Sequence, residues 1–168
     1  DPLDIIKLPA PEALFATVIH PKIELKTADS RRILKQQLSI KDGIRHWGNV
    51  GAFVSGLYTN NYERIGNSLK DYIAEPQRSA LIPQYDEMKA AIMESGALGA
   101  GISGSGPSVF ALSKGETTAK QVAKAMKNCY QNIDINFDIH VSKINEQGIK
   151  ILATDDSLQN TKQSVVQP

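Results

Sequence analysis

A run of small residues in the second half of the chain could hold an anion. Gly99-Ala100-Gly101-Ile102-Ser103-Gly104-Ser105-Gly106-Pro107 places glycines, whose backbone can adopt positive φ and approach a ligand closely, beside serine hydroxyls that add hydrogen-bond donors. The same composition suits a connection between elements that binds nothing. The residues alone leave both interpretations open.

Two common nucleotide-binding motifs do not explain this run. Residues 99–104 match G-x-G-x-x-G, but the dinucleotide fingerprint requires a strand before it and a helix after it. Here we expect a helix before the run and a strand after it. A Walker A loop is excluded because no Lys-Ser or Lys-Thr pair closes the run.

Three arginines could recognise a carboxylate. Arg31 and Arg32 follow Thr27, and Arg78 follows Pro76. A guanidinium can clamp a carboxylate through two parallel hydrogen bonds, and the threonine hydroxyl could assist. Isolated arginines are more often solvated surface residues, so their positions alone do not assign a site.

The other reactive side chains predict neither a catalytic residue nor a metal site. His20, His46 and His140 are far apart, and no pair has the i, i+4 spacing with a carboxylate that a metal site would need. Cys129 lies near the apolar stripe of a predicted helix and is interpreted as a small core residue. As the sole cysteine it cannot form an internal disulfide, which fits a reducing compartment.

The first part of the chain predicts a strand and a long helix. Residues 13–19 form a short apolar run bounded by prolines, which is typical of a buried strand. Ser39 begins a capping box, and Gly48 and Gly51 would allow close packing within the helix that follows. Apolar residues recur at helical spacing and predict a core helix: Ile44, Trp47, Val50, Val54, Leu57 and Tyr58.

Two further helices are predicted before the glycine run. One passes through Ile65, Leu69 and Tyr72 and should end at Pro76, because proline cannot continue a helical ladder. The next should begin at Pro83. Its core face would carry Tyr85, Met88 and Ile92, with Gly96 just beyond its end.

The second part predicts strands around one more helix. Residues 108–112 are interpreted as a strand, and Thr118–Gln121 as the capping box of a helix with an apolar stripe. Apolar and polar residues alternate over 133–142, which predicts a strand with one wet face. Residues 148–152 offer a return strand, and the chain after residue 154 is expected to be a flexible tail.

These elements favour an α+β fold, with a ferredoxin-like antiparallel sheet packed by helices. A strand in which apolar and polar residues alternate implies that one face of the sheet is solvated. This disfavours a doubly wound parallel sheet, whose two faces are both covered. The expected order is strand, helices, strand, strand, helix, strand.

Composition excludes several classes of function. The chain has 168 residues, a formal net charge of +1 and a hydrophobic fraction of 41%, which suits one globular domain with its own core. Charges are mixed rather than clustered, so we expect no nucleic-acid partner. No apolar run approaches the roughly 20 residues needed to cross a bilayer, so we expect no membrane partner and a cytoplasmic location.

The sequence resembles the GHMP kinases and, within them, the homoserine kinases. Residues 96–112, which contain the glycine run, are similar to the third conserved motif of the superfamily. Leu8–Pro11, Thr27–Arg31, Glu75–Pro83 and His140–Ser142 agree with the homoserine kinase pattern in order and spacing. The likeness runs from about residue 1 to residue 152, so we predict a GHMP kinase C-terminal domain at 1–153 and a tail at 154–168.

The resemblance implies a binding role for specific residues. Thr27, Arg31 and Arg78 would hold the substrate L-homoserine, with both arginines at its carboxylate. The glycine-rich loop would lie where the substrate meets the phosphates of ATP, and it comprises Gly101, Ser103, Gly104, Ser105, Gly106 and Pro107. Ser30 departs from the alanine that is frequent in the family before Arg31, but the spacing is kept.

Features of the family's N-terminal kinase domain are not found in these 168 residues. They are the phosphate loop, the acidic residue for Mg²⁺ and the aspartate that meets the substrate hydroxyl. Together with the missing initiator Met at Asp1, this leads us to expect a partner N-terminal domain outside this chain. Phosphoryl transfer depends on positioning and charge neutralisation, so the chain alone should be inactive and should bind neither ATP nor Mg²⁺.

The resemblance therefore predicts part of an enzyme that makes O-phospho-L-homoserine from ATP and L-homoserine in threonine biosynthesis. Two alternatives stay open: another GHMP small-molecule kinase, or a free-standing ferredoxin-like module that binds an amino acid. If a partner domain is missing, its apolar docking surface would be exposed, and a homo-oligomer is then expected.

Overall fold

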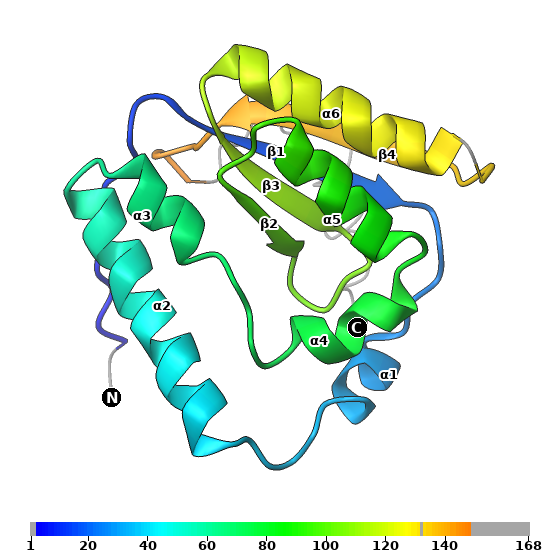
Figure 1. Cartoon of the computed structure of the whole chain (residues 1–168), viewed down its shortest axis with the longest axis horizontal. Helices are drawn as coiled ribbons and strands as arrows, with labels where there is room; N and C mark the ends of the chain where they lie inside the picture. Colours follow the sequence, from blue (N-terminus) through cyan, green and yellow to red (C-terminus); the bar gives the residue numbers. More distant parts are fainter. Residues whose placement is uncertain (1–2, 132, 149–168) are drawn as a thin grey trace, which may run out of the picture.

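The computed structural model describes residues 3–131 and 133–148 and folds them into a four-stranded sheet with helices (Figure 1). The strands are β1 (Leu14–Pro21), β2 (Gly99–Ile102), β3 (Val109–Lys114) and β4 (Phe137–Lys143). The helices are α1 (Thr27–Arg32), α2 (Ile40–Tyr58), α3 (Tyr62–Asn67), α4 (Glu75–Arg78), α5 (Tyr85–Glu94) and α6 (Glu116–Gln131), with a 3-10 turn at Ser79–Leu81. Within the described ranges, no helix is long and apolar enough to cross a membrane.

The sheet is antiparallel, in the order β2-β3-β1-β4. In β1, Ile19 lies opposite Val109 of β3 on one side and Ile139 of β4 on the other. The chain passes from β2 to β3 through a hairpin. This sheet and the element order confirm the predicted α+β fold class.

α5 and α6 cover one face of the sheet and bury the larger core. Thr17 and Ile19 of β1 and Val109 of β3 are fully buried there. The hydroxyl of Thr17 donates to the carbonyl of Ala119 at 3.1 Å, so this buried polar group is satisfied. The predicted stripe of α6 is confirmed by four side chains without exposed surface, which are Ala119, Val122, Met126 and Tyr130.

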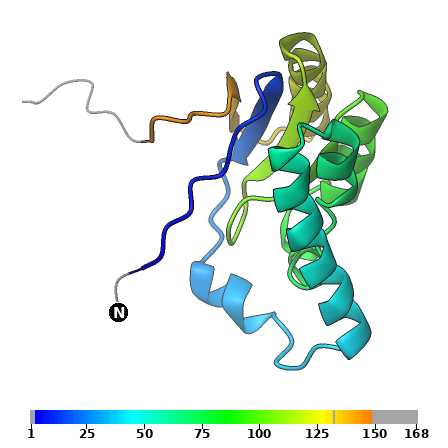
Figure 2. The same cartoon turned by 90° about the vertical axis from the view of Figure 1, so that its left-hand side faces the viewer.

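α2 and α3 pack against the other face of the sheet. A smaller core joins Leu57 of α2 and Ile65 of α3 to Leu14 and Leu112 of the strands. The approach is close, because a Cβ added at Gly56 would lie 2.9 Å from the Ile65 side chain. α2 itself runs along the outside of the molecule (Figures 1 and 2).

The long helix was predicted correctly, but its apolar face was not. Ser39 caps α2 by accepting from the backbone N–H of Asp42 at 3.1 Å, as the capping box indicates. Of the side chains expected in the core, Leu57 is buried as predicted, but Ile44, Val50 and Tyr58 are exposed, and Trp47 is 67% exposed. A Cβ added at Gly48 or Gly51 would meet nothing within 4 Å, so these glycines do not serve close packing within the described part of the chain.

Three local predictions also differ from the structure. The second helix ends at Asn67 rather than Pro76, and Pro76 instead lies in the first turn of α4, where its missing N–H costs nothing. α6 begins at Glu116, before the expected capping box at Thr118. Residues 99–102, expected as loop, form β2.

The strand predicted over 133–142 has the expected alternation of half-buried and exposed side chains, but it begins later, at Phe137. Ile139 and Val141 are half-buried while Asp138 and His140 are exposed, so the wet face is confirmed. The return strand at 148–152 and the tail fall almost entirely outside the described residues.

Candidate functional site

The glycine-rich segment forms the tip of the β2–β3 hairpin. The backbone N–H of Ser103 donates to the carbonyl of Ser108 at 2.8 Å and closes the hairpin. Gly104 and Gly106 have φ of +61° and +84°, as expected for a loop built from glycine. Ser103 and Gly104 are exposed, so the tip presents its backbone at the surface.

Gly101 lies in β2 and not in the loop, which corrects the sequence-based assignment. The absence of a side chain at Gly101 is nevertheless needed for packing. A Cβ added there would lie 3.1 Å from the ring of Phe110 and 3.5 Å from a carboxylate oxygen of Glu75. Gly101 therefore lets an aromatic ring and an acidic side chain approach the base of the hairpin.

Arg78 connects the hairpin tip to α1. Its Nε donates to the carbonyl of Ser30 at 3.0 Å, and its Nη1 donates to the carbonyl of Gly104 at 3.0 Å. Two segments that are distant in the sequence are thus held by one half-buried guanidinium. A guanidinium has five N–H donors, and these two bonds leave donors available for an anion.

Thr27 and Arg31 lie on α1, beside this contact. They are four residues apart and therefore lie on the same side of the helix. Arg31 directly follows Ser30, whose carbonyl binds Arg78. Arg31 is exposed, and among the described residues no hydrogen bond or ion pair occupies its guanidinium. The structure thus brings α1, Arg78 and the hairpin tip together, whereas Gly101 lies at the base of the hairpin.

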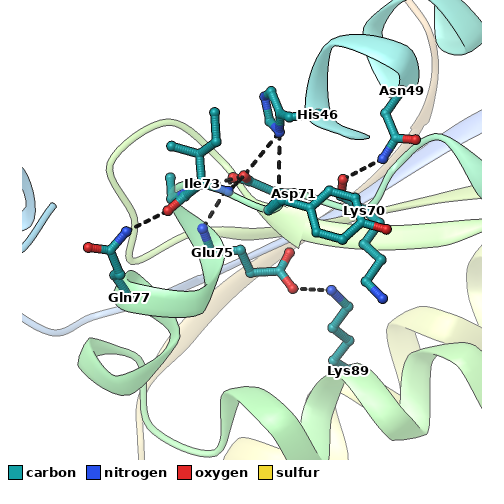
Figure 3. A network of polar contacts seen from close by, with 10 residues as sticks. His46, Asn49, Lys70, Asp71, Ile73, Glu75, Gln77 and Lys89 are labelled. Carbon is teal, nitrogen blue, oxygen red and sulfur yellow. Dashed lines mark hydrogen bonds and ion pairs between the residues drawn. The ribbon is translucent and has the colours of Figure 1, made fainter. Parts of the chain in front are cut away.

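A network of polar contacts holds the short helix α4 that carries Arg78 (Figure 3). The carboxylate of Asp71 accepts from the backbone N–H groups of Ile73 at 2.7 Å, Ala74 at 3.0 Å and Glu75 at 3.2 Å. An acidic group at this position satisfies the free N–H groups of a helix N-terminus and complements its dipole. Nδ1 of His46 in α2 lies 3.5 Å from the same carboxylate.

The other side of α4 is held by a buried ion pair. Glu75 pairs with Lys89 of α5, and both side chains are mostly buried. The second carboxylate oxygen of Glu75 and the hydroxyl of Tyr85 are buried without a hydrogen bond among the described residues. The pKa of Tyr85 is raised well above its usual range, mainly by burial and next by the negative charge of Glu75.

Two cavities flank α4. One, of about 390 Å³, lies between α4, α5 and the start of β2, and its lining includes Glu75, Tyr85 and Lys89. The other, of about 500 Å³, lies between α2 and the sheet and is mainly apolar, with His46 and Gly101 in its lining. Glu75 borders both cavities, so the ion pair stands between them.

The sequence indicated the arginines but not the groups that position them. Asp71 was missed, although an acidic residue shortly before proline is a signal for a helix start. Pro76 was interpreted as a stop only. The pairing of Glu75 with Lys89 joins residues 14 positions apart and has no local signal. In the described part of the chain, no three His, Cys, Asp or Glu side chains gather as metal ligands would.

Comparisons with known proteins identify the family of this fold. A family model described as GHMP kinases C terminal matches residues 53–132. A homoserine kinase of Chlorobium phaeobacteroides (strain BS1) is 44% identical over 154 residues, which are 90% of this chain and 48% of that protein. A homoserine kinase of Pyrococcus furiosus is 35% identical over 127 residues, which are 76% of this chain and 42% of that protein.

Solved structures point the same way. The crystal structure of homoserine kinase from Cytophaga hutchinsonii has a TM-score of 0.84 and 48% identity, and covers 86% of this chain and 46% of that chain. A phosphomevalonate kinase of Streptococcus pneumoniae, at 18% identity and a TM-score of 0.58, shares the fold alone. The chain spans about half the length of the curated relatives it matches.

Proposed function

Because the chain belongs to the GHMP kinases, as a C-terminal domain of the homoserine kinase type, we propose that it forms the substrate-holding half of a homoserine kinase. The whole enzyme would transfer the γ-phosphate of ATP to the side-chain hydroxyl of L-homoserine. The observation that carries this proposal is Arg78, whose guanidinium binds the hairpin tip and α1 at once.

In this proposal Arg31 and Arg78 recognise the α-carboxylate of L-homoserine, and Thr27 orients the amino acid. Two guanidinium groups close together favour a bound anion, and a carboxylate matches their fork geometry. The bonds from Arg78 to two backbone carbonyls fix its orientation before substrate arrives. Fixing a binding group in advance lowers the entropy lost on binding.

The hairpin tip would line the reacting end of the substrate. Its residues in this role are Ser103, Gly104, Ser105, Gly106 and Pro107, with Gly101 at the base. The N–H groups of Ser103 and Gly106 donate within the hairpin. The peptide N–H groups of Gly104 and Ser105, together with the serine hydroxyls, would therefore be the donors that face phosphate oxygens. We assign ATP and Mg²⁺ chiefly to the half of the enzyme that the longer relatives possess in addition, because phosphate charge must be neutralised there.

The product, O-phospho-L-homoserine, would belong to threonine biosynthesis in the cytoplasm. Identity favours homoserine over other substrates of the superfamily. Homoserine kinases reach 48% identity with this chain, whereas the phosphomevalonate kinase and mevalonate kinase structures that share the fold lie between 16% and 20%. Substrates such as mevalonate have no α-amino group.

The test is to join this chain to the N-terminal half of the Cytophaga hutchinsonii homoserine kinase and assay ATP-dependent phosphorylation. We expect the joined protein to phosphorylate L-homoserine and to show little activity with mevalonate. This chain alone should show no activity, although its circular dichroism spectrum should be that of a folded protein. Turnover by the chain alone would contradict the division of roles. A joined, folded protein that prefers mevalonate would contradict the substrate.

A further inference from the structure

The short helix α4 contacts the β2–β3 hairpin at both its base and its tip. Glu75 begins this one-turn helix and Arg78 ends it. At the tip, Arg78 donates to the carbonyl of Gly104 at 3.0 Å. At the base, a carboxylate oxygen of Glu75 lies 3.5 Å from the position that a Cβ on Gly101 would take. Residues three apart in a helix share one side of the same turn, so a shift of Glu75 would also shift Arg78.

Lys89 of α5 holds Glu75 from outside α4. Its ammonium pairs with one carboxylate oxygen of Glu75 (Figure 3). The exposed fraction of the side chain is 28% for Lys89 and 13% for Glu75. The ammonium also lies 5.8 Å from the centre of the Tyr85 ring, and this second contact favours a cation here. A mostly buried ion pair is screened little by salt, so it can hold α4 against α5 more firmly than a surface pair would.

The position of the Glu75 carboxylate depends on this partner. Among the described residues, its second oxygen is buried without a hydrogen bond. A buried carboxylate is costly unless a cation compensates its charge, so Lys89 allows Glu75 to stay at the base of the hairpin. Gly101 provides the room on the other side, because a side chain there would approach both Glu75 and the ring of Phe110.

We infer that Lys89 is a positioning residue for substrate recognition and that it acts on Arg78 through Glu75. The inference rests on the proposed function, in which Arg78 binds the α-carboxylate of L-homoserine. Lys89 lines the cavity between α4 and α5, whereas Arg78 bonds to α1 and to the hairpin tip. Lys89 therefore supports the site from behind α4 and does not contact the substrate.

Kinetics of a full-length enzyme that contains this domain test the inference. Lys89→Met keeps a long side chain but removes its charge. We expect it to raise the KM for L-homoserine roughly threefold or more, with kcat nearly unchanged, because only the binding of the substrate carboxylate is weakened. Lys89→Arg keeps a cation and should restore part of this loss. Lys124→Met, at an exposed position on α6, is the matched control and should leave the KM unchanged.

A double variant separates positioning from stability. Glu75→Gln combined with Lys89→Met leaves no buried charge without a partner, so much of the stability lost in Lys89→Met should return. Urea unfolding of the same proteins measures this recovery. The KM for L-homoserine should stay raised, because no ion pair then fixes α4 to α5. A KM that recovers together with stability would overturn the inference, since Lys89 would then serve stability alone.

Arg78→Ala separates the inference from the proposed function. If Arg78→Ala raises the KM for L-homoserine and Lys89→Met does not, the inference is wrong and the proposed function stands. If Arg78→Ala leaves the KM unchanged, the proposed role of Arg78 fails, and the inference fails with it.

Discussion

At the scale of single residues, the central group is the Arg78 guanidinium. It donates to Ser30 of α1 and to Gly104 of the hairpin, which gives the candidate site its shape. The sequence indicated Arg31 and Arg78 through their resemblance to a family pattern, since an isolated arginine has no signal of its own. The donors that fix Arg78 are satisfied by backbone carbonyls distant in the sequence, and such pairs appear only after folding.

Two buried tyrosines should make stability fall at alkaline pH. Burial raises the pKa of Tyr130 to about 12, and the pKa of Tyr85 is raised further by burial and by Glu75. In the unfolded chain a tyrosine loses its proton near pH about 10, while the folded chain keeps it. The free energy of unfolding should therefore decrease as pH rises from about 10 to about 12.

Urea unfolding at a series of pH values measures this decrease. Tyr130→Phe removes one of the two groups and should make the decrease shallower. At neutral pH both tyrosines are protonated, so the difference in the free energy of unfolding between the two proteins at that pH is the reference for the values at higher pH. An equal decrease in Tyr130→Phe and the parent chain would contradict the assignment.

At the scale of elements, helices and strands followed from the sequence where local pattern decides them. The alternation over 133–142 and the cap at Ser39 are examples. β2 was missed, because Gly99 and Gly101 have poor strand propensity and pair only once β3 is beside them. The exposed side of α2 was misassigned, because helical periodicity gives a face but not its partner.

Asp71 should control the position of α4 without contacting substrate. Its carboxylate accepts from three backbone N–H groups, so Asp71→Ala should lower the free energy of unfolding by about 1–2 kcal/mol. In a full-length enzyme, the KM for L-homoserine should rise because Arg78 at the end of α4 loses its support. Asp71→Asn, which keeps one acceptor oxygen, should restore part of both losses. Unchanged stability in Asp71→Ala would contradict this role.

Two glycines in different surroundings should respond oppositely to alanine. A Cβ at Gly66 of α3 would lie 2.5 Å from the backbone carbonyl oxygen of Leu98, so Gly66→Ala should destabilise by about 1–3 kcal/mol. Gly48 of α2 has open surroundings, so Gly48→Ala should stabilise by about 0.5–1 kcal/mol. Chemical unfolding measures both. Equal effects would mean that Gly66 does not lie against the Leu98 carbonyl.

At the scale of the whole molecule, the architecture brings the residues proposed to hold the amino acid to the same end as the glycine-rich hairpin. α1, α4 and the β2–β3 hairpin meet at one end of the sheet (Figure 1). The antiparallel sheet, with α5 and α6 on one face, supplies the rigid support. The fold class was predictable because the order of elements was. The exposure of the apolar side chains of α2 was not, since helical periodicity does not show what covers a face.

The most direct test of the proposed site is the effect of Arg31→Ala on both Michaelis constants of a full-length enzyme. We expect the KM for L-homoserine to rise by roughly tenfold or more, because a charge-assisted contact to the carboxylate is lost, while the KM for ATP stays nearly constant. Arg32→Ala is the matched control, because Arg32 is exposed and its guanidinium pairs with Asp29 at 2.9 Å; both constants should stay unchanged. An equal rise in both constants for Arg31→Ala, or no rise in either, would contradict the account.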